Sequence, residues 1–273
     1  MSVTIHSVEL DGFHMDYFRF GRGPRTLVIL PGLSVQSVMG AAEAVAEAYK
    51  ALEEDFTIYV FDRRAELPPI YRIEDMARDT ARAFQALGLW ETCLFGASQG
   101  GMIALAMAIE YPELAGRLAL GSTTSHVTEA QYRVLASWAE LAKKGDRLGL
   151  YLAFGREIYP PQVFRQYREA LAAAAETVTD QELERFIILT EGMKDFNLSE
   201  QVGRIRCPVL AIGAFEDSVL DSDATMEIAE RLDHRPDFRL YMYTGFGHAA
   251  FDTAPDYRER LLRFFRQGEP GKD

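Results

Sequence analysis

A serine set among glycines lies at residues 96–101, where the chain reads Gly-Ala-Ser-Gln-Gly-Gly. The segment follows a short apolar run at 92–95 and opens a helix-like run at 102–109. A serine at a sharp strand-to-helix turn is typical of a nucleophile elbow, which lifts the hydroxyl above the edge of a sheet. The positive end of the new helix then faces the oxyanion that forms during attack. The spacing predicts that Ser98 is a nucleophile; the alternative is a Gly-rich turn in which Ser98 only caps the helix.

A histidine that can activate this serine follows the last strand-like run of the chain. A serine hydroxyl is a poor nucleophile until a base takes its proton, and the base needs a third group to fix its tautomer. His248 lies in the loop 244–249, just past the apolar run 238–243. The other histidines lie in the predicted N-terminal hairpin, at the start of a helical region or in a charged loop: His6, His14, His126 and His234. We therefore expect His248 to be the base, against the alternative of a turn histidine hydrogen-bonded to the backbone.

The acid that orients the histidine should also follow the end of a strand. Residues 212–217 read Ile-Gly-Ala-Phe-Glu-Asp and leave an apolar run. Asp217 is the expected acid. Glu216 stays open as an alternative, because a shift of one residue would exchange the two carboxylates. A further interpretation is that Asp217 caps a turn ahead of the helix that begins near residue 221.

Two backbone N–H groups are expected to form the oxyanion hole. One is the N–H of Gln99, the residue directly after the nucleophile. The second is the N–H of Leu33, in the loop Pro-Gly-Leu-Ser at 31–34 that follows the apolar run 26–30. Gly32 permits the close backbone approach that such a loop needs. An ordinary turn is the alternative interpretation of this loop.

Strand-like and helix-like segments alternate around these residues. An N-terminal hairpin is predicted at 3–10 and 13–20, and further strands are predicted at 26–30, 56–61, 92–95, 118–120, 208–213 and 238–243. Continuous apolar strands that alternate with helices indicate a parallel sheet covered on both faces. The predicted fold class is therefore α/β, with a mostly parallel eight-stranded sheet and helices on both faces.

The alternation stops between residues 122 and 206. Helix-like sequence continues there at 129–144, 162–176 and 181–193 without an intervening strand. Because ligands bind at the carboxyl ends of the strands in open α/β sheets, we expect this segment to cover that edge. The predicted organisation is a core formed by 1–121 and 207–273, with a helical cap inserted at 122–206.

Composition restricts the partners and cofactors of the chain. Lys and Arg total 29 and Asp and Glu total 41, for a net charge of −12, which argues against nucleic acid and against an anionic membrane surface. We find no signal peptide and no apolar run of membrane-spanning length, and expect a cytoplasmic protein. Cys93 and Cys207 lie in strand-like contexts and are expected to be buried thiols. No cofactor or metal is expected, and a monomer and a homodimer are both left open.

The chain resembles enzymes of the α/β-hydrolase fold, in the group that includes esterases, lactonases and carbon–carbon hydrolases. The serine–acid–histidine order is the order of that fold, and the resemblance covers nearly the whole chain. The motifs that carry it are the turn Phe61-Asp62-Arg63-Arg64, the elbow at 96–101, and the segments 111–113, 207–210, 247–249 and 254–256. The resemblance implies a triad of Ser98, Asp217 and His248, with Leu33 and Gln99 lining the oxyanion hole.

Three features depart from that family's usual pattern. Pro31 replaces the common histidine before Gly32, Ala65 replaces a glycine, and the acid lies four residues after Gly213 rather than three. The last departure is a second reason to keep Glu216 as an alternative.

Three functions fit these residues. The first is a serine hydrolase that cleaves a small carboxylic ester or lactone through an acyl-enzyme. The second, carbon–carbon bond hydrolysis or cofactor-free perhydrolysis, uses the same triad. The third, from another class, is a ligand sensor or signalling protein with little or no turnover, suggested by the Pro31-Gly32 loop and the large cap.

Overall fold

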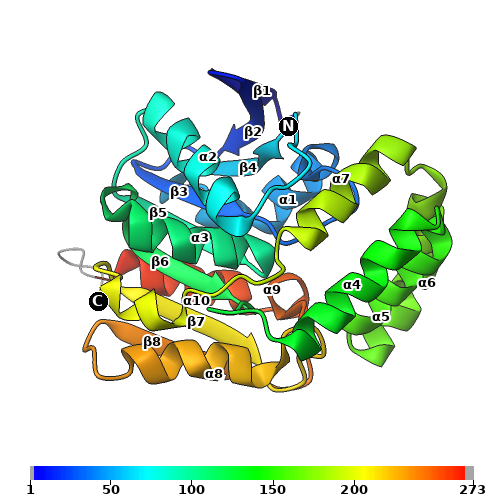
Figure 1. The fold of residues 1–273 in the computed structure, drawn as a ribbon. Coiled ribbons are helices and arrows are strands. Elements are labelled where there is room, and N and C mark those ends of the chain that lie inside the picture. The colour runs from blue at the N-terminus through cyan, green and yellow to red at the C-terminus, as the bar shows by residue number, and fades with distance from the viewer. Residues whose placement is uncertain (1–2, 268–273) are drawn as a thin grey trace.

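The computed structural model describes residues 3–267, so the ends of the predicted core, residues 1–2 and 268–273, lie outside the described part. An eight-stranded sheet with the order β1-β2-β4-β3-β5-β6-β7-β8 forms its centre (Figure 1). The strands are β1 Ile5–Leu10, β2 Phe13–Phe20, β3 Arg25–Leu30, β4 Phe56–Arg64, β5 Thr92–Ala97, β6 Ala115–Gly121, β7 Val209–Ala214 and β8 Phe238–Tyr243. β2 pairs antiparallel with β1 and with β4, and the other neighbouring strands are parallel. The predicted α/β fold with a mostly parallel sheet is confirmed.

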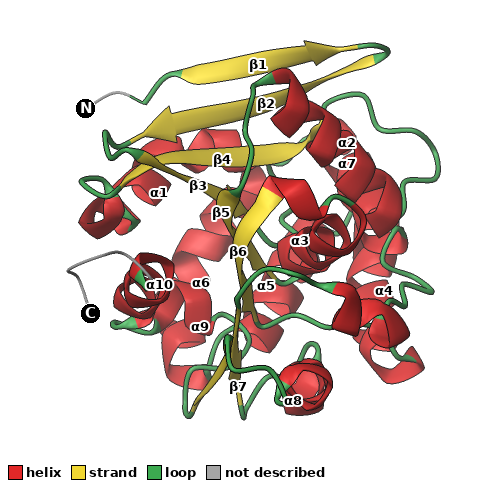
Figure 2. Ribbon diagram, turned by 90° about the vertical axis from the view of Figure 1, so that its left-hand side faces the viewer, coloured by secondary structure: helices red, strands yellow, loops and turns green. Residues whose placement is uncertain are grey.

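Helices cover both faces of the sheet. Along β5, Leu94 belongs to one buried cluster, while Cys93 and Phe95 belong to the other. The first cluster includes residues of α2 Ile73–Ala86, α3 Gln99–Glu110 and α8 Asp221–Leu232, and the second includes residues of α1 Ala42–Ala48, α9 Ala250–Thr253 and α10 Tyr257–Arg266. Figure 2 shows α1 and α10 on one side of the sheet and α2 and α3 on the other. Burial on both faces explains why the central strands β5 and β7 are buried at every position and rich in apolar residues.

Among the core helices, α2 is amphipathic and packs on the sheet. Its residues Ile73, Met76 and Phe84 are buried and recur at the spacing of one helix face. Among residues 3–267 there is no helix with the length and apolarity needed to cross a membrane.

β4 continues beyond the predicted strand end. The sequence suggested a stop at Asp62, but the strand runs to Arg64. Pairing with β2 accounts for the extension, since Met15 of β2 lies opposite Arg64 and a register shift separates this pair from Tyr17 and Phe61. The extension places the buried Asp62 and Arg63 at the carboxyl end of β4.

The segment between β6 and β7 is helical, as the sequence indicated. It contains α4 Glu129–Lys143, α5 Arg147–Ile158, α6 Pro161–Glu176, α7 Asp180–Glu191 and a short 3₁₀ helix at Ser199–Arg204. α4, α5 and α6 lie together to one side of the sheet, and α7 lies between them and α2 (Figure 1). We call residues 122–206 the helical insertion.

α5 lies outside the helical runs predicted from the sequence, where Gly145 and Gly149 suggested an interruption; a further glycine, Gly155, lies within the helix. The Asp146 side chain caps the helix by accepting a hydrogen bond from the Gly149 N–H at 2.8 Å. Gly155 lies against α6, where a Cβ would be 2.5 Å from Leu171 Cδ1. Gly149 and Gly155 therefore serve capping and close packing, and neither interrupts the helix.

Candidate active site

The turn that carries Ser98 has the geometry of an elbow. Ser98 joins β5 to α3 with φ 52° and ψ −120°, a conformation that costs a non-glycine residue about 1–3 kcal/mol. The neighbouring glycines make the turn sterically feasible. A Cβ on Gly96 would lie 2.3 Å from the Gly100 carbonyl oxygen, and a Cβ on Gly100 would lie 2.0 Å from the Leu30 carbonyl oxygen. Gly96 and Gly100 are thus required because the backbone segments at this turn approach each other too closely for a Cβ.

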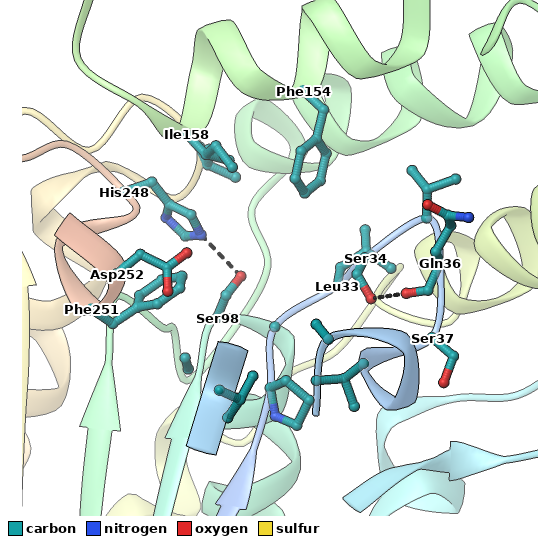
Figure 3. Close-up of a pocket in the computed structure, with 18 of the residues that line it drawn as sticks. Leu33, Ser34, Gln36, Ser37, Ser98, Phe154, Ile158, His248, Phe251 and Asp252 are labelled. Carbon is teal, nitrogen blue, oxygen red and sulfur yellow. Dashed lines mark hydrogen bonds between the residues drawn. The ribbon is translucent and has the colours of Figure 1, made fainter. Parts of the chain in front are cut away.

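Ser98, His248 and Asp217 form one hydrogen-bonded chain. His248 Nε2 lies 3.0 Å from Ser98 Oγ, and His248 Nδ1 lies 2.8 Å from Asp217 Oδ2. Both His248 and Asp217 are buried, and Ser98 is half-buried. If Nδ1 carries the proton that binds Asp217, Nε2 is left free to accept the hydroxyl proton of Ser98. Figure 3 shows the Ser98–His248 pair at one end of a cavity.

The two adjacent carboxylates that the sequence left open have different partners. Asp217 Oδ1 accepts the N–H groups of Val219 and Leu220 at 2.9 and 3.0 Å, which leaves Oδ2 for the imidazole. Glu216 Oε2 instead accepts the N–H of Gly245 at 2.7 Å, in the loop that precedes His248. The carboxylate that faces the imidazole therefore belongs to Asp217, and Glu216 ties down the histidine loop.

The expected oxyanion donors both lie beside Ser98. Gln99 is the first residue of α3, so its N–H has no acceptor within the helix. The loop after β3 passes close to the serine, since a Cβ on Gly32 would lie 3.3 Å from Ser98 Cβ. Leu33 follows in this loop and lines the same cavity as Ser98 (Figure 3).

A buried arginine connects these two backbone segments, a role that no local sequence pattern indicates. Arg63 Nη2 donates to the Pro31 carbonyl at 2.7 Å and to Gln99 Oε1 at 2.8 Å. Gln99 Nε2 in turn donates to the Leu189 carbonyl of α7 at 2.7 Å. Burial lowers the pKa of Arg63 to about 10, so the guanidinium is still charged at neutral pH. One cation thus holds the loop of Leu33, the start of α3 and, through Gln99, the helical insertion.

A second arginine attaches the insertion to the sheet. Arg185 of α7 contacts Asp62 Oδ1 at 2.8 Å and donates to the Arg64 carbonyl at 2.9 Å. Ser37 Oγ donates to the other oxygen of Asp62 at 2.5 Å. The only sequence signal for these contacts is the charged triplet Asp62-Arg63-Arg64 at the end of β4, which belongs to a turn that resembles one in the α/β-hydrolase family.

Ser98 and His248 open into a cavity of about 700 Å³, a size suited to a small organic ligand. The insertion supplies Leu135, Trp138, Tyr151, Phe154, Ile158, Tyr159, Leu171, Glu182 and Met193 to its wall. Some of these rings also pack on one another, as Trp138 does on Phe154 with centroids 4.7 Å apart. Among residues 3–267 no group of three or more His, Cys, Asp or Glu side chains is arranged to bind a metal ion.

Comparison with known proteins gives matches over most of the chain. Residues 69–253 match the family described as "Serine aminopeptidase, S33". A protein of Cronobacter turicensis named "Putative carbamate hydrolase RutD" is 27% identical over 227 residues, which cover 78% of this chain and 81% of that protein.

Two solved structures are similar along nearly their whole length. MGS-M2, an α/β hydrolase enzyme from a Medee basin deep-sea metagenome library, has a TM-score of 0.84 at 19% identity and covers 98% of this chain and 100% of its own. The enol-lactonase from Burkholderia xenovorans LB400 has a TM-score of 0.81 at 18% identity, with coverages of 96% and 100%. At these identities the likeness shows a shared fold.

Proposed function

This chain belongs to the α/β-hydrolase family described as serine aminopeptidase, S33, and we propose that it is a serine hydrolase that cleaves a small carboxylic ester or lactone. The observation that carries the proposal is the chain Ser98–His248–Asp217, with distances of 3.0 and 2.8 Å, at the wall of a cavity of about 700 Å³. A nucleophile, a base in reach of it and a group that orients the base are the parts that acyl transfer needs.

The proposed reaction runs through an acyl-enzyme. Ser98 Oγ attacks the carbonyl carbon while His248 Nε2 accepts the hydroxyl proton. The oxyanion is held by the N–H groups of Gln99 and Leu33. Collapse of the tetrahedral intermediate expels the alcohol, which takes the proton from His248. Water then attacks the acyl group with the same base, and release of the acid restores Ser98.

The helical insertion is proposed to act as the cap of this site. Its aromatic and aliphatic side chains, among them Phe154 and Ile158, line the cavity opposite Ser98 (Figure 3). Apolar walls favour an apolar acyl or alcohol group. The contacts of Arg185 with Asp62 and of Gln99 with Leu189 would hold this cap over the sheet edge.

Hydrolysis of a carbamate is a second candidate. The protein of Cronobacter turicensis that aligns with 78% of this chain is named a carbamate hydrolase. A carbamate ester has a carbonyl carbon that the same serine can attack, so the proposed triad and oxyanion donors serve both reactions. Carbon–carbon hydrolysis and perhydrolysis would use the same residues, and the choice among these is made by substrate profiling.

Substitution of the nucleophile tests the proposal. Ser98→Ala should keep the fold and lower kcat/KM for p-nitrophenyl esters by roughly 10⁴-fold or more. The matched control is Ser137→Ala, because Ser137 is on the outer surface of α4 and donates only to the Val134 carbonyl. Mass spectrometry after treatment with a fluorophosphonate should find one adduct, on Ser98, in the unsubstituted protein.

The outcomes separate the hypotheses. Full activity in Ser98→Ala would exclude the proposed nucleophile. A fluorophosphonate adduct on Ser98 without turnover of any ester in an acyl-chain series would instead favour the sensor hypothesis.

A further inference from the structure

The cavity contains a carboxylate that the proposed reaction does not use. Asp252 lies in α9, four residues after His248, and lines the cavity beside Phe251. Figure 3 shows its carboxylate at the end of the cavity where Ser98 and His248 lie. An acidic side chain in this position can contact a ligand bound in the cavity.

Arg258 is the neighbouring cation, and it leaves the acceptor sites of Asp252 open. Its Nη2 is 3.9 Å from Asp252 Oδ1, beyond hydrogen-bond distance. Its Nη1 donates to the backbone carbonyl of Asp252 at 3.0 Å, and its guanidinium lies over the Tyr49 ring at 5.2 Å. Within residues 3–267, no side chain or backbone donor makes a hydrogen bond to the carboxylate of Asp252.

The other carboxylate of the cavity wall, Glu182, has a structural role that explains it. Its Oε2 accepts the backbone N–H of Thr179 at 2.8 Å and the hydroxyl of the same residue at 2.9 Å, which completes the capping box of α7. Its Oε1 is 3.4 Å from Gln36 Nε2. Glu182 is therefore already engaged, whereas Asp252 is not.

The side chain of Asp252 is 55% exposed, and the surrounding protein atoms partly desolvate its carboxyl group. This burial raises the pKa of Asp252, and Arg258 lowers it by a smaller amount. A carboxylate that accepts no hydrogen bond from the protein favours a ligand that brings a donor.

The remaining wall of the cavity suits a cation and opposes an anion. No Lys or Arg is among the described residues that line it. The rings of Tyr49, Tyr159 and Phe251 line the same cavity as Asp252, and aromatic faces attract ammonium groups. A substrate carboxylate would meet two acidic side chains, Glu182 and Asp252, and no Lys or Arg side chain among the described lining residues.

We propose that Asp252 is a specificity-determining residue that binds a protonated amine on the substrate, so that the preferred substrates are esters carrying an ammonium group. The assignment rests on the proposed serine hydrolase function, which places the reacting ester at Ser98. The ammonium would donate to Asp252 while the apolar wall contacts the intervening methylenes.

A matched set of esters tests this assignment. Ethyl 6-aminohexanoate, ethyl heptanoate and monoethyl adipate have chains of nearly equal length and differ in terminal charge. Shorter members of each series vary the distance between the ester and the terminal group. The ratio of kcat/KM for the amine ester to that for the neutral ester should exceed about tenfold, and the anionic ester should be the poorest. Asp252→Asn should reduce the ratio at least fivefold. Glu259→Gln, which removes an exposed carboxylate paired with Arg263 on α10, should leave it within twofold.

A binding measurement tests whether Asp252 binds an ammonium group, independently of turnover. Calorimetry on the Ser98→Ala protein measures the affinity for n-alkylammonium, n-alkanol and n-alkanoate probes of four to seven carbons. The ammonium probes should bind most tightly, and adding Asp252→Asn should abolish this preference. Preference for the alkanoate, or an ammonium preference that Asp252→Asn does not change, would overturn the assignment. Turnover of ethyl heptanoate with no amine preference would reject the assignment of Asp252 alone. Ammonium binding without hydrolysis of any ester would reject the proposed function alone.

Discussion

Two glycines, Gly100 in α3 and Gly155 in α5, allow close approach in different ways. A Cβ on Gly100 would lie 2.0 Å from the Leu30 carbonyl oxygen and 2.5 Å from that of Pro31. A Cβ on Gly155 would lie 2.5 Å from Leu171 Cδ1. The first collision is with the backbone of a central strand, which cannot move without the sheet. The second is with the end of a side chain, which can change rotamer.

The contrast extends from these glycines to the regions around them. At the sheet edge, every residue of α3 except Glu110 at its end is buried, and the elbow is held by backbone contacts. In the helical insertion, α6 buries only Ala175. The sheet edge therefore holds the proposed reacting groups rigidly, while the insertion shapes the cavity with side chains that can adjust. We expect substitutions in the first region to affect stability or chemistry and those in the second to affect substrate fit.

The largest effect should come from Gly100→Ala. The new Cβ would displace the backbone of β3 and the loop of Leu33, so the free energy of unfolding should fall by more than about 3 kcal/mol. Urea unfolding measures this change. Gly203→Ala is the matched control, because a Cβ there would meet nothing within 4 Å, and its effect should be within about 0.5 kcal/mol. An unchanged urea midpoint for Gly100→Ala would contradict the backbone argument.

Replacing Arg63 should have the next largest effect, and mainly on the chemical step. Arg63→Met removes the donor shared by Pro31 and Gln99, so both proposed oxyanion donors lose their support. We expect kcat for a p-nitrophenyl ester to fall by about 10- to 100-fold, less than the ~10²–10³ typical of deleting an oxyanion donor outright. KM should change by no more than about threefold.

A matched variant separates this role from general destabilisation. Arg165→Met removes an exposed arginine of α6 and should leave kcat unchanged. Measurements well below the unfolding temperature of each variant remove losses caused by unfolding. An Arg63→Met enzyme with lower stability but normal kcat would show that Arg63 is structural only.

The smallest effect is expected for Gly155→Ala. Movement of Leu171 can relieve the contact, and alanine gains about 1 kcal/mol of helix propensity over glycine. The net change in the free energy of unfolding should therefore be within about 1 kcal/mol. Leu171 lines the cavity, so KM for long acyl chains should rise while KM for acetate esters stays constant. A loss of stability as large as that of Gly100→Ala would remove the distinction between the two regions.

Local sequence patterns were sufficient for the sheet and for most of the candidate site. Continuous apolar runs identified the parallel strands, because burial on both faces requires apolar residues at every position. Ser98 was found from its glycines, which the tight turn requires. His248 was found from its place after a strand, since loops at the carboxyl ends of parallel strands meet at one edge. Each of these inferences depends on neighbours within a few residues.

The contacts that the sequence did not predict join segments far apart in the chain. Asp217 and Glu216 are adjacent and chemically alike, and only the path of the backbone decides which carboxylate faces His248. Arg63 lies 36 residues from Gln99 in the chain, and no local pattern predicts the hydrogen bond between the Arg63 guanidinium and the Gln99 side chain.

Asp252 has no local signal either, because its place in the cavity depends on how α9 packs beside His248 and on the walls that the helical insertion supplies. The sequence by itself thus determined the strands of the sheet and most of the helices, and it indicated a hydrolase, because these follow from short-range periodicity and turn sterics. The tertiary structure alone decided the partner of each polar side chain, because burial and hydrogen bonding depend on which distant segments pack together.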